Sequence, residues 1–159
     1  MKKIAIITDG NQGIVDAIKC YNSDCITDIF DNAEFNSSEY DLVAGINCSE
    51  NFEGINTHFS LLPSFSGEEP VRQAILAGVK VTGLTVFYTN PFRIIAQYPV
   101  FIKNDSHFDD VETELNYLLQ TLYPIIINKI LNNEQFEIKD ILKQSGCSHN
   151  CSSCGGCNK

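Results

Sequence analysis

The chain has few basic residues. Its 159 residues include 11 lysines and arginines against 20 aspartates and glutamates, which gives a formal net charge of −9. A general nucleic-acid binder or a membrane-surface binder neutralises phosphates with many basic side chains. The composition therefore argues against DNA and anionic membranes as partners, although backbone amides could still hold a small anionic ligand.

Long apolar runs are also missing. No stretch reaches the roughly eighteen apolar residues that a membrane-spanning helix needs. The start, Met1-Lys2-Lys3-Ile4, leads directly into a strand pattern and lacks a cleavable signal peptide. Hydrophobic residues make up 43% of the chain, enough for one domain with a substantial core. We therefore expect a cytoplasmic protein without a membrane partner.

Strand and helix patterns alternate in the first half of the chain. Strand patterns cover residues 2–10, 25–31, 41–47 and 54–59, and helix patterns cover residues 11–21 and 68–78. Such alternation predicts an α/β fold with a Rossmann-like, mainly parallel sheet that helices cover on both faces. Gly78 is a plausible C-terminal cap for the second helix.

The second half predicts a hairpin and a long helix. Two β-rich runs, residues 82–89 and 93–102, are separated by a short segment with Asn-Pro, which favours a tight turn. Residues 107–133 form an amphipathic helix pattern, for which Asp105 or Ser106 is the expected N-cap. Pro124 is expected to kink this helix or to split it.

Four of the seven cysteines lie close together near the end of the chain. The segment CSHNCSSCGGC places Cys147, Cys151, Cys154 and Cys157 at Cys-x3-Cys-x2-Cys-x2-Cys spacing. Four thiolates at such spacing can bind one Zn²⁺ or one iron–sulfur cluster, and the spacing does not choose between them. His149 could replace one sulfur, and a tail with free thiols is the plainer alternative. We predict a folded domain over residues 1–143 and a Cys-rich metal-binding tail over residues 144–159.

Asn56 and His58 form a polar pair at the end of the strand pattern 54–59. A Leu-Leu-Pro segment and Gly67 follow them. Two polar side chains at a buried strand end cost stability unless they are hydrogen-bonded. In parallel sheets ligands bind beyond the carboxyl ends of the strands, so the pair is a candidate site. The plainer alternative is a capped strand end with a hydrogen-bonded core histidine.

The segment INTHFSLLPSFSG, residues 55–67, carries a family resemblance. It resembles the N-[IV]-H-x-S-L-L-P-x-x-x-G signature of the folate-dependent formyltransferases, which include glycinamide ribonucleotide formyltransferase and methionyl-tRNA formyltransferase. The following EEPVRQAILAGVKVTGLTVFY is similar to the methionyl-tRNA branch. The resemblance covers residues 1–131, is strongest over residues 55–101, and implies a shortened formyltransferase fold.

The resemblance implies formyl transfer from 10-formyltetrahydrofolate to a small-molecule amine. In this chemistry Asn56 would donate a hydrogen bond to the formyl oxygen as negative charge builds on it. His58 would assist by hydrogen bonding and proton transfer. Folate contacts are implied for Ala44, Gly45, Ile46 and Asn90, and substrate contacts for Gly10 and Asn11.

The family pattern also has an aspartate, in a D-x-G-P loop, that this chain lacks. Here Tyr88 is followed by Thr89-Asn90-Pro91-Phe92, and Asn90 is the nearest polar residue. Glu68 or Glu69 could supply a carboxylate from another direction. Two hypotheses therefore stand: a small formyltransferase, or a non-catalytic module with a degenerate site that binds a ligand or metal through its tail. A homodimer, in which a second chain covers a sheet edge, is also open.

Overall fold

A computed structural model describes residues 1–137 of the chain. A single sheet has six strands in the order β2-β1-β3-β4-β5-β6. The strands are β1 (Lys3–Ile7), β2 (Ile26–Phe30), β3 (Leu42–Gly45), β4 (Ile55–His58), β5 (Val81–Tyr88) and β6 (Arg93–Phe101). The helices are α1 (Gln12–Tyr21), α2 (Pro70–Leu76) and α3 (Phe108–Leu131), and η1 (Ser37–Glu39) is a short 3₁₀ helix.

The sheet is mixed. Strand β1 pairs in parallel with β2 and β3, and β3 pairs in parallel with β4. Strand β5 pairs antiparallel with both β4 and β6. The predicted parallel sheet is therefore present in the first four strands, and the predicted hairpin over residues 82–102 adds the two antiparallel pairings.

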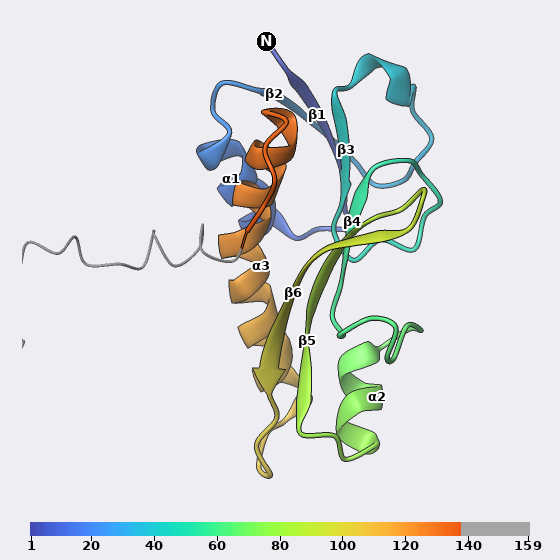
Figure 1. Ribbon diagram of the computed structural model, residues 1–159, viewed down its shortest axis with the longest axis vertical. Coiled ribbons are helices and arrows are strands. Elements are labelled where there is room, and N and C mark those ends of the chain that lie inside the picture. Colours follow the sequence, from blue (N-terminus) through green and yellow to red (C-terminus); the bar gives the residue numbers. More distant parts are fainter. Residues whose placement is uncertain (138–159) are drawn as a thin grey trace, which may run out of the picture.

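Helices α1 and α3 lie side by side on one face of the sheet (Figure 1). The buried Asn22 joins them, because its Nδ2 donates to the carbonyl oxygen of Pro124 at 3.2 Å. Its Oδ1 in turn accepts from Nδ2 of Asn128 at 3.1 Å. The two helices thus meet through polar bonds as well as apolar contacts, and the bond to Pro124 is buried.

The opposite face of β1 and β3 is covered by a loop instead of a helix. The ring of Phe30 stacks on that of Phe35 with 4.1 Å between centroids, and Tyr40 meets Phe30 edge-on at 5.8 Å. These rings pack against the apolar residues Ala5, Ile7 and Val43. The expectation of helices on both faces is wrong here, because the polar connection from β2 to β3 has only the short η1.

Helix α3 is one continuous helix of 24 residues, and Pro124 does not divide it. Pro124 is buried against the rest of the fold, so packing holds the helix together where a proline would break an isolated one. The N-cap is His107 instead of Asp105 or Ser106. The reason is local: the backbone N–H of His107 donates to Oδ2 of Asp110 at 3.1 Å, three residues on.

Helix α2 ends as the sequence predicts. Gly78 has φ +72, and its N–H donates to the carbonyl oxygen of Ile75 at 3.0 Å. The helix lies near the start of α3, where the guanidinium of Arg72 is 5.6 Å from the ring centre of Phe108. This packing fixes the end of the connection that leads from β4 into α2.

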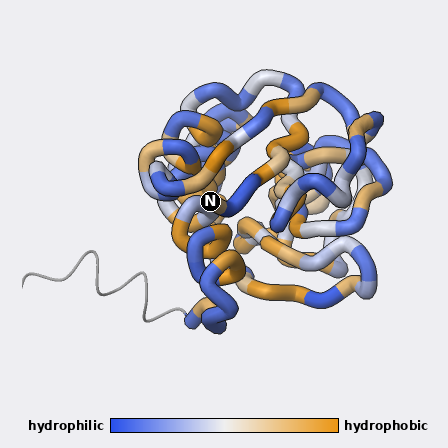
Figure 2. Tube along the Cα trace, turned by 90° about the horizontal axis from the view of Figure 1, so that it is seen from above, coloured by the Kyte–Doolittle hydropathy of each residue, from blue (hydrophilic) through white to orange (hydrophobic). Residues whose placement is uncertain are grey.

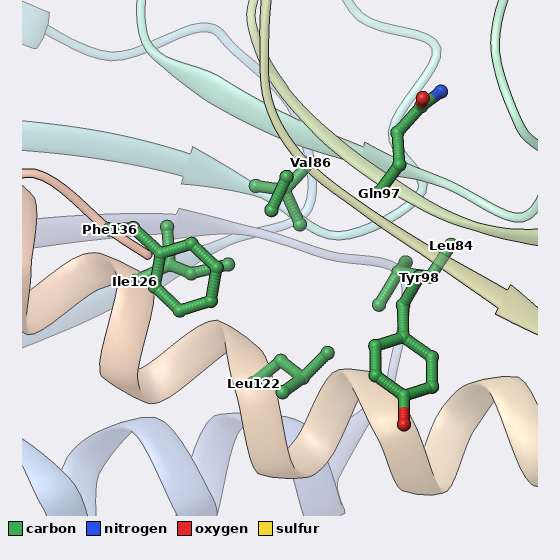
Figure 3. Close-up of a pocket in the computed structure, with 8 residues that line it drawn as sticks. Leu84, Val86, Gln97, Tyr98, Leu122, Ile126 and Phe136 are labelled. Carbon is green, nitrogen blue, oxygen red and sulfur yellow. The ribbon is translucent and has the colours of Figure 1, made fainter. Parts of the chain in front are cut away.

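The β5–β6 hairpin packs on α3 through apolar side chains (Figure 3). Leu84 and Val86 of β5 face Leu122 and Ile126 of α3, and Phe136 closes the contact from the segment after the helix. The space left between them is about 10 Å³, hardly the room of one water molecule. Figure 2 shows that hydrophobic stretches of the trace are short and interrupted by hydrophilic residues. Within residues 1–137 no helix is long and apolar enough to cross a membrane.

Tyr123 ties α3 to the two strands at the centre of the sheet. Its side chain is fully buried, and its hydroxyl lies 2.8 Å from the carbonyl oxygen of Gly45 and 3.3 Å from that of Ile55. Burial holds the pKa of Tyr123 well above its usual range, so the hydroxyl keeps the proton that it donates. The helix thereby supports the end of β3 and the start of β4.

This arrangement predicts a stability loss in Tyr123→Phe. The variant leaves buried carbonyl groups without their hydroxyl donor, so the free energy of unfolding should fall by about 1–3 kcal/mol. Tyr117→Phe is the matched control on the same helix, because Tyr117 is 70% exposed and should change stability by less than about 0.5 kcal/mol. Urea denaturation measures both, and equal losses would contradict the role of the hydroxyl.

Candidate active site

Asn56 and His58 project from the face of the sheet opposite α1 and α3. Side chains alternate along a strand, and Ile55 belongs to the core cluster beneath α3. Asn56 and His58 therefore lie on the other side, at the carboxyl end of β4. Both line one cleft of about 610 Å³, whose other walls come from residues 47–49, residues 66–70, Phe59 and Phe87.

The carboxamide of Asn56 is held in one orientation. Its Nδ2 donates to the carbonyl oxygen of Cys48 at 2.6 Å, and its Oδ1 accepts from the N–H of Cys48 at 3.3 Å. Oδ1 also accepts from the N–H of Thr57 at 2.8 Å. An amide nitrogen carries two hydrogens, and within residues 1–137 only one of them has a partner. The second is available to a ligand in the cleft.

A glycine at position 45 leaves room for this carboxamide. A Cβ on Gly45 would lie 2.8 Å from Oδ1 of Asn56 and 2.6 Å from the ring of Phe52. The neighbouring Ala44 and Ile46 are buried in the core. Residues 44–46, which the resemblance assigns to folate, therefore lie behind the cleft and shape it, and none of them is among the residues that line it.

His58 is half-buried and hydrogen-bonded at both ring nitrogens. Nε2 lies 3.3 Å from the carbonyl oxygen of Gly67, and Nδ1 lies 2.9 Å from the hydroxyl of the buried Ser60. A carbonyl oxygen can only accept, so Nε2 carries the hydrogen and Nδ1 accepts from Ser60. Burial lowers the pKa of His58 below its usual 6.5, against the opposing hydrogen bond to Gly67. Burial therefore favours the neutral ring.

The acidic residues that share the cleft with His58 come from the segment after Gly67. Asn90 lies in the exposed turn between β5 and β6, and it is not among the residues that line the cleft. The acidic residues that do line it are Glu68 and Glu69. Oε1 of Glu69 lies 3.7 Å from the guanidinium of Arg72. The structure thus places both glutamates, and not Asn90, in the lining of the cleft that also holds His58.

Gly10 and Asn11 lie at the same sheet edge but outside the cleft lining. Gly10 has φ +135 in the turn from β1 to α1, and Asn11 is the N-cap residue of α1. Their backbone N–H groups donate to Oγ1 of Thr8 at 3.4 and 3.3 Å. These amides therefore have a partner within the turn, and their role toward a substrate stays a prediction.

Cys48 is the site residue that the sequence does not reveal. Its backbone fixes Asn56, and burial raises the pKa of its half-buried thiol. The available signal is its position just after the strand pattern 41–47, at the sheet edge where ligands bind.

A metal site is not found in the described part of the chain. Among residues 1–137 no group of three or more His, Cys, Asp or Glu side chains could hold an ion, and Cys20, Cys25 and Cys48 are free. The predicted ligands Cys147, Cys151, Cys154 and Cys157 lie outside the described residues. The predicted boundary between the folded domain and the tail, at residue 143, also lies outside the described residues.

The sequence matches known proteins over its central part. A family model described as formyl transferase matches residues 40–124, just over half of the chain. Over 83 residues the chain is 41% identical to the phosphoribosylglycinamide formyltransferase of Bacillus subtilis (strain 168), covering 48% of this chain and 42% of that protein. Over 86 residues it is 38% identical to the methionyl-tRNA formyltransferase of Lysinibacillus sphaericus (strain C3-41), covering 49% of this chain and 28% of that protein. The match spans less than half the length of either curated relative.

Solved structures share the fold over most of the chain. The crystal structure of phosphoribosylglycinamide formyltransferase from Bacillus halodurans has a TM-score of 0.66 at 22% identity, covering 86% of this chain and 100% of that chain. The crystal structure of a 4-N formyltransferase from Francisella tularensis has a TM-score of 0.72 at 21% identity, covering 86% of this chain and 72% of that chain. At these identities the similarity concerns the fold, and it confirms the predicted formyltransferase fold.

The lowered pKa of His58 predicts a pH dependence of stability. Folding favours the neutral ring, so its stabilisation is complete above the unfolded-state pKa of about 6.5 and is lost as the pH falls through the lower folded-state pKa. Between about pH 7.5 and about pH 5, the free energy of unfolding should therefore fall more steeply in the unmodified protein than in His58→Gln. Urea denaturation at both pH values measures this difference. His107→Gln, at the exposed start of α3, is the control. If this variant reduced the pH dependence of the free energy of unfolding as much as His58→Gln does, the assignment to His58 would be contradicted.

Proposed function

Because this chain belongs to the formyl transferase family, we propose that it transfers a formyl group from 10-formyltetrahydrofolate to an amine, with Asn56 and His58 as catalytic residues. One observation carries the proposal: both side chains line the same cleft, and Asn56 is fixed with one N–H group left for a ligand. A plain capped strand end would need neither the cleft nor the spare donor.

The cleft suits the folate donor in size and chemistry. A volume of about 610 Å³ lies within the range of roughly 300–1,000 Å³ that is common for small-molecule sites. Phe59 and Phe87 give it apolar aromatic walls, and Asn56 and His58 add the polar groups that would orient a ligand. Aromatic walls with a few fixed polar groups match a flat heterocycle such as a pterin.

The residues support a direct transfer. The amine nitrogen bonds to the formyl carbon, the carbon–nitrogen bond to folate then breaks, and the amine loses one proton, which the departing folate nitrogen gains. Asn56 would donate its spare N–H to the formyl oxygen while that oxygen carries negative charge. His58 would take part in the proton transfer as a neutral ring. Its bond from Nε2 to Gly67 is long at 3.3 Å, so a substrate atom could take its place.

Ser60 would take over the orienting task that the family gives to its loop aspartate. The aspartate is absent, yet Nδ1 of His58 lies 2.9 Å from the Ser60 hydroxyl, and this contact would remain when a substrate atom replaces Gly67 at Nε2. A neutral hydroxyl stabilises a protonated ring less than a carboxylate does. We therefore expect a formyltransferase that is slower than one with the complete set of residues.

The proposal predicts a large loss of activity in Asn56→Ala. Removing a donor to the developing oxyanion should lower the rate of amine-dependent tetrahydrofolate release by about 10²–10³-fold. The same change leaves the carbonyl of Cys48 without its partner, so assays belong below the melting temperature of the variant. Asn36→Ala, which alters an exposed cap of η1, is the control and should keep its rate.

Titration calorimetry with a reduced folate separates this enzyme from a non-catalytic module. The unmodified protein should bind the folate, and His58→Ala should bind it more weakly. Absence of binding by both proteins would contradict formyl transfer and favour a module that acts through other ligands.

We also propose that the Cys-rich tail binds one metal ion or cluster. The Cys-x3-Cys-x2-Cys-x2-Cys spacing supports this, since four thiolates in a short segment suit tetrahedral Zn²⁺ or an iron–sulfur cluster. Such a tail would give the chain a binding role beside, or instead of, formyl transfer.

Elemental analysis of anaerobically purified protein tests the tail. We expect about one zinc per chain, or iron and sulfide with broad visible absorption. The double variant Cys151→Ser/Cys154→Ser should lose the metal, and Cys20→Ser, at an exposed free cysteine, should retain it. Protein that takes up neither metal, even with zinc or iron supplied, would rule out the site.

A homodimer stays a prediction. Strand β6 stands at the end of the sheet, and the exposed hydrophobic side chains Phe92, Ile94 and Phe101 lie in or next to it. An unpaired strand edge of this kind is a place where a second chain can add. Light scattering of the purified chain would measure its mass in solution.

A further inference from the structure

We infer that Glu68 is a substrate-binding residue that selects the acceptor, pairing with a cationic group that the acceptor carries besides its reacting amine. The inference rests on the proposed function and names its substrate class: amines with a second positive charge and no phosphate.

The backbone of Glu68 is fixed directly beside His58. Nε2 of His58 lies 3.3 Å from the carbonyl oxygen of Gly67, which belongs to the peptide unit that leads into Glu68. On the other side, Nε2 of Gln73 donates to the carbonyl oxygen of Glu68 at 2.6 Å. Two hydrogen bonds therefore hold the neighbouring carbonyl groups of Gly67 and Glu68, and Glu68 directly follows the residue that contacts the imidazole ring.

The carboxylate of Glu68 is free to bind a ligand. Both Glu68 and Glu69 line the cleft, but Glu69 is already paired with Arg72 at 3.7 Å. For Glu68, the contacts within residues 1–137 include no ion pair or hydrogen bond at the carboxylate. Of the two acids, Glu68 is thus the one whose charge an incoming cation can neutralise.

The surroundings of the cleft oppose a phosphorylated acceptor. Among the described residues that line it there is no lysine or arginine, and Arg72 is engaged by Glu69. The backbone amides of Gly10 and Asn11, the nearest turn at this sheet edge, donate to Thr8. A phosphate would find carboxylates where it needs cations or open amides.

The charge that Glu68 pairs with does not belong to the reacting nitrogen. An ammonium has no lone pair, so the attacking amine must be neutral when it bonds to the formyl carbon beside Asn56. A second cationic group on the acceptor can remain charged throughout the reaction. Pairing it with Glu68 would hold the neutral amine near His58 without slowing its attack.

A matched series of probes tests the inference. The compounds 1,4-diaminobutane, 4-aminobutan-1-ol and 4-aminobutyl phosphate share one amine and differ in the charge of the second group. Their dissociation constants follow from NMR titrations of the backbone amides of Gly67 and Glu68. We expect the diamine to bind most tightly and the phosphate most weakly. In Glu68→Gln the diamine, which carries two ammonium groups, should lose roughly two- to fivefold in affinity, and the alcohol, which carries one, should lose less.

The control is Glu69→Gln, a neighbouring carboxylate in the same cleft that already has a cationic partner. It should weaken diamine binding less than Glu68→Gln does. The inference is overturned if the phosphate binds as tightly as the diamine, if both variants behave alike, or if no probe shifts these amides. Folate binding by the unmodified protein is measured separately, so its absence would overturn formyl transfer and not the charge preference of the cleft.

Discussion

The carboxamide of Asn56 bonds to the backbone of Cys48 through both its oxygen and its nitrogen, and the cleft depends on this pair of bonds. They join the carboxyl end of β4 to the loop after β3, so two neighbouring strands present their ends at a fixed separation. Burying the amide of Asn56 without hydrogen-bond partners would lower the stability of the fold. Its partners here are the backbone N–H and carbonyl groups of Cys48, which need hydrogen bonds themselves. The same atoms therefore stabilise the fold and orient a donor toward the cleft.

Support for this arrangement comes from the far side of the sheet. Tyr123 of α3 reaches the carbonyl oxygen of Gly45 from one face, while the absent side chain of Gly45 makes room for Asn56 on the other. Helix α3 in turn is joined to α1 through the buried Asn22. A change in the packing of α3 would thus reach the cleft through β3, although no residue of α3 lines the cleft. Figure 1 shows α3 on one side of the sheet.

Local sequence patterns predicted many elements of this fold. Where the structure differs from these predictions, contacts between distant parts of the chain are the main cause. The strands, the hairpin and the cap at Gly78 follow from alternation and turn residues, and the signature around Asn56 and His58 located the cleft. The uninterrupted α3 did not follow, because tertiary packing around Pro124 outweighs its local preference. The loop of aromatic rings between β2 and β3 was missed because it has no periodicity. The position of Asn90 relative to His58 was missed because it depends on the antiparallel pairing of β5 with β4, which places the end of β5 beside the start of β4 and away from His58.

The cleft is bordered by loops along most of its rim, since residues 47–49 and 66–70 flank the end of β4. Loops tolerate substitutions and insertions better than paired strands do. Asn56 and His58 belong to strand β4, whereas most of the remaining cleft lining belongs to these connections. Substitutions in the connections can therefore change the shape and charge of the cleft without moving the strand that carries Asn56 and His58. In this chain the two neighbouring glutamates after Gly67 occupy such positions.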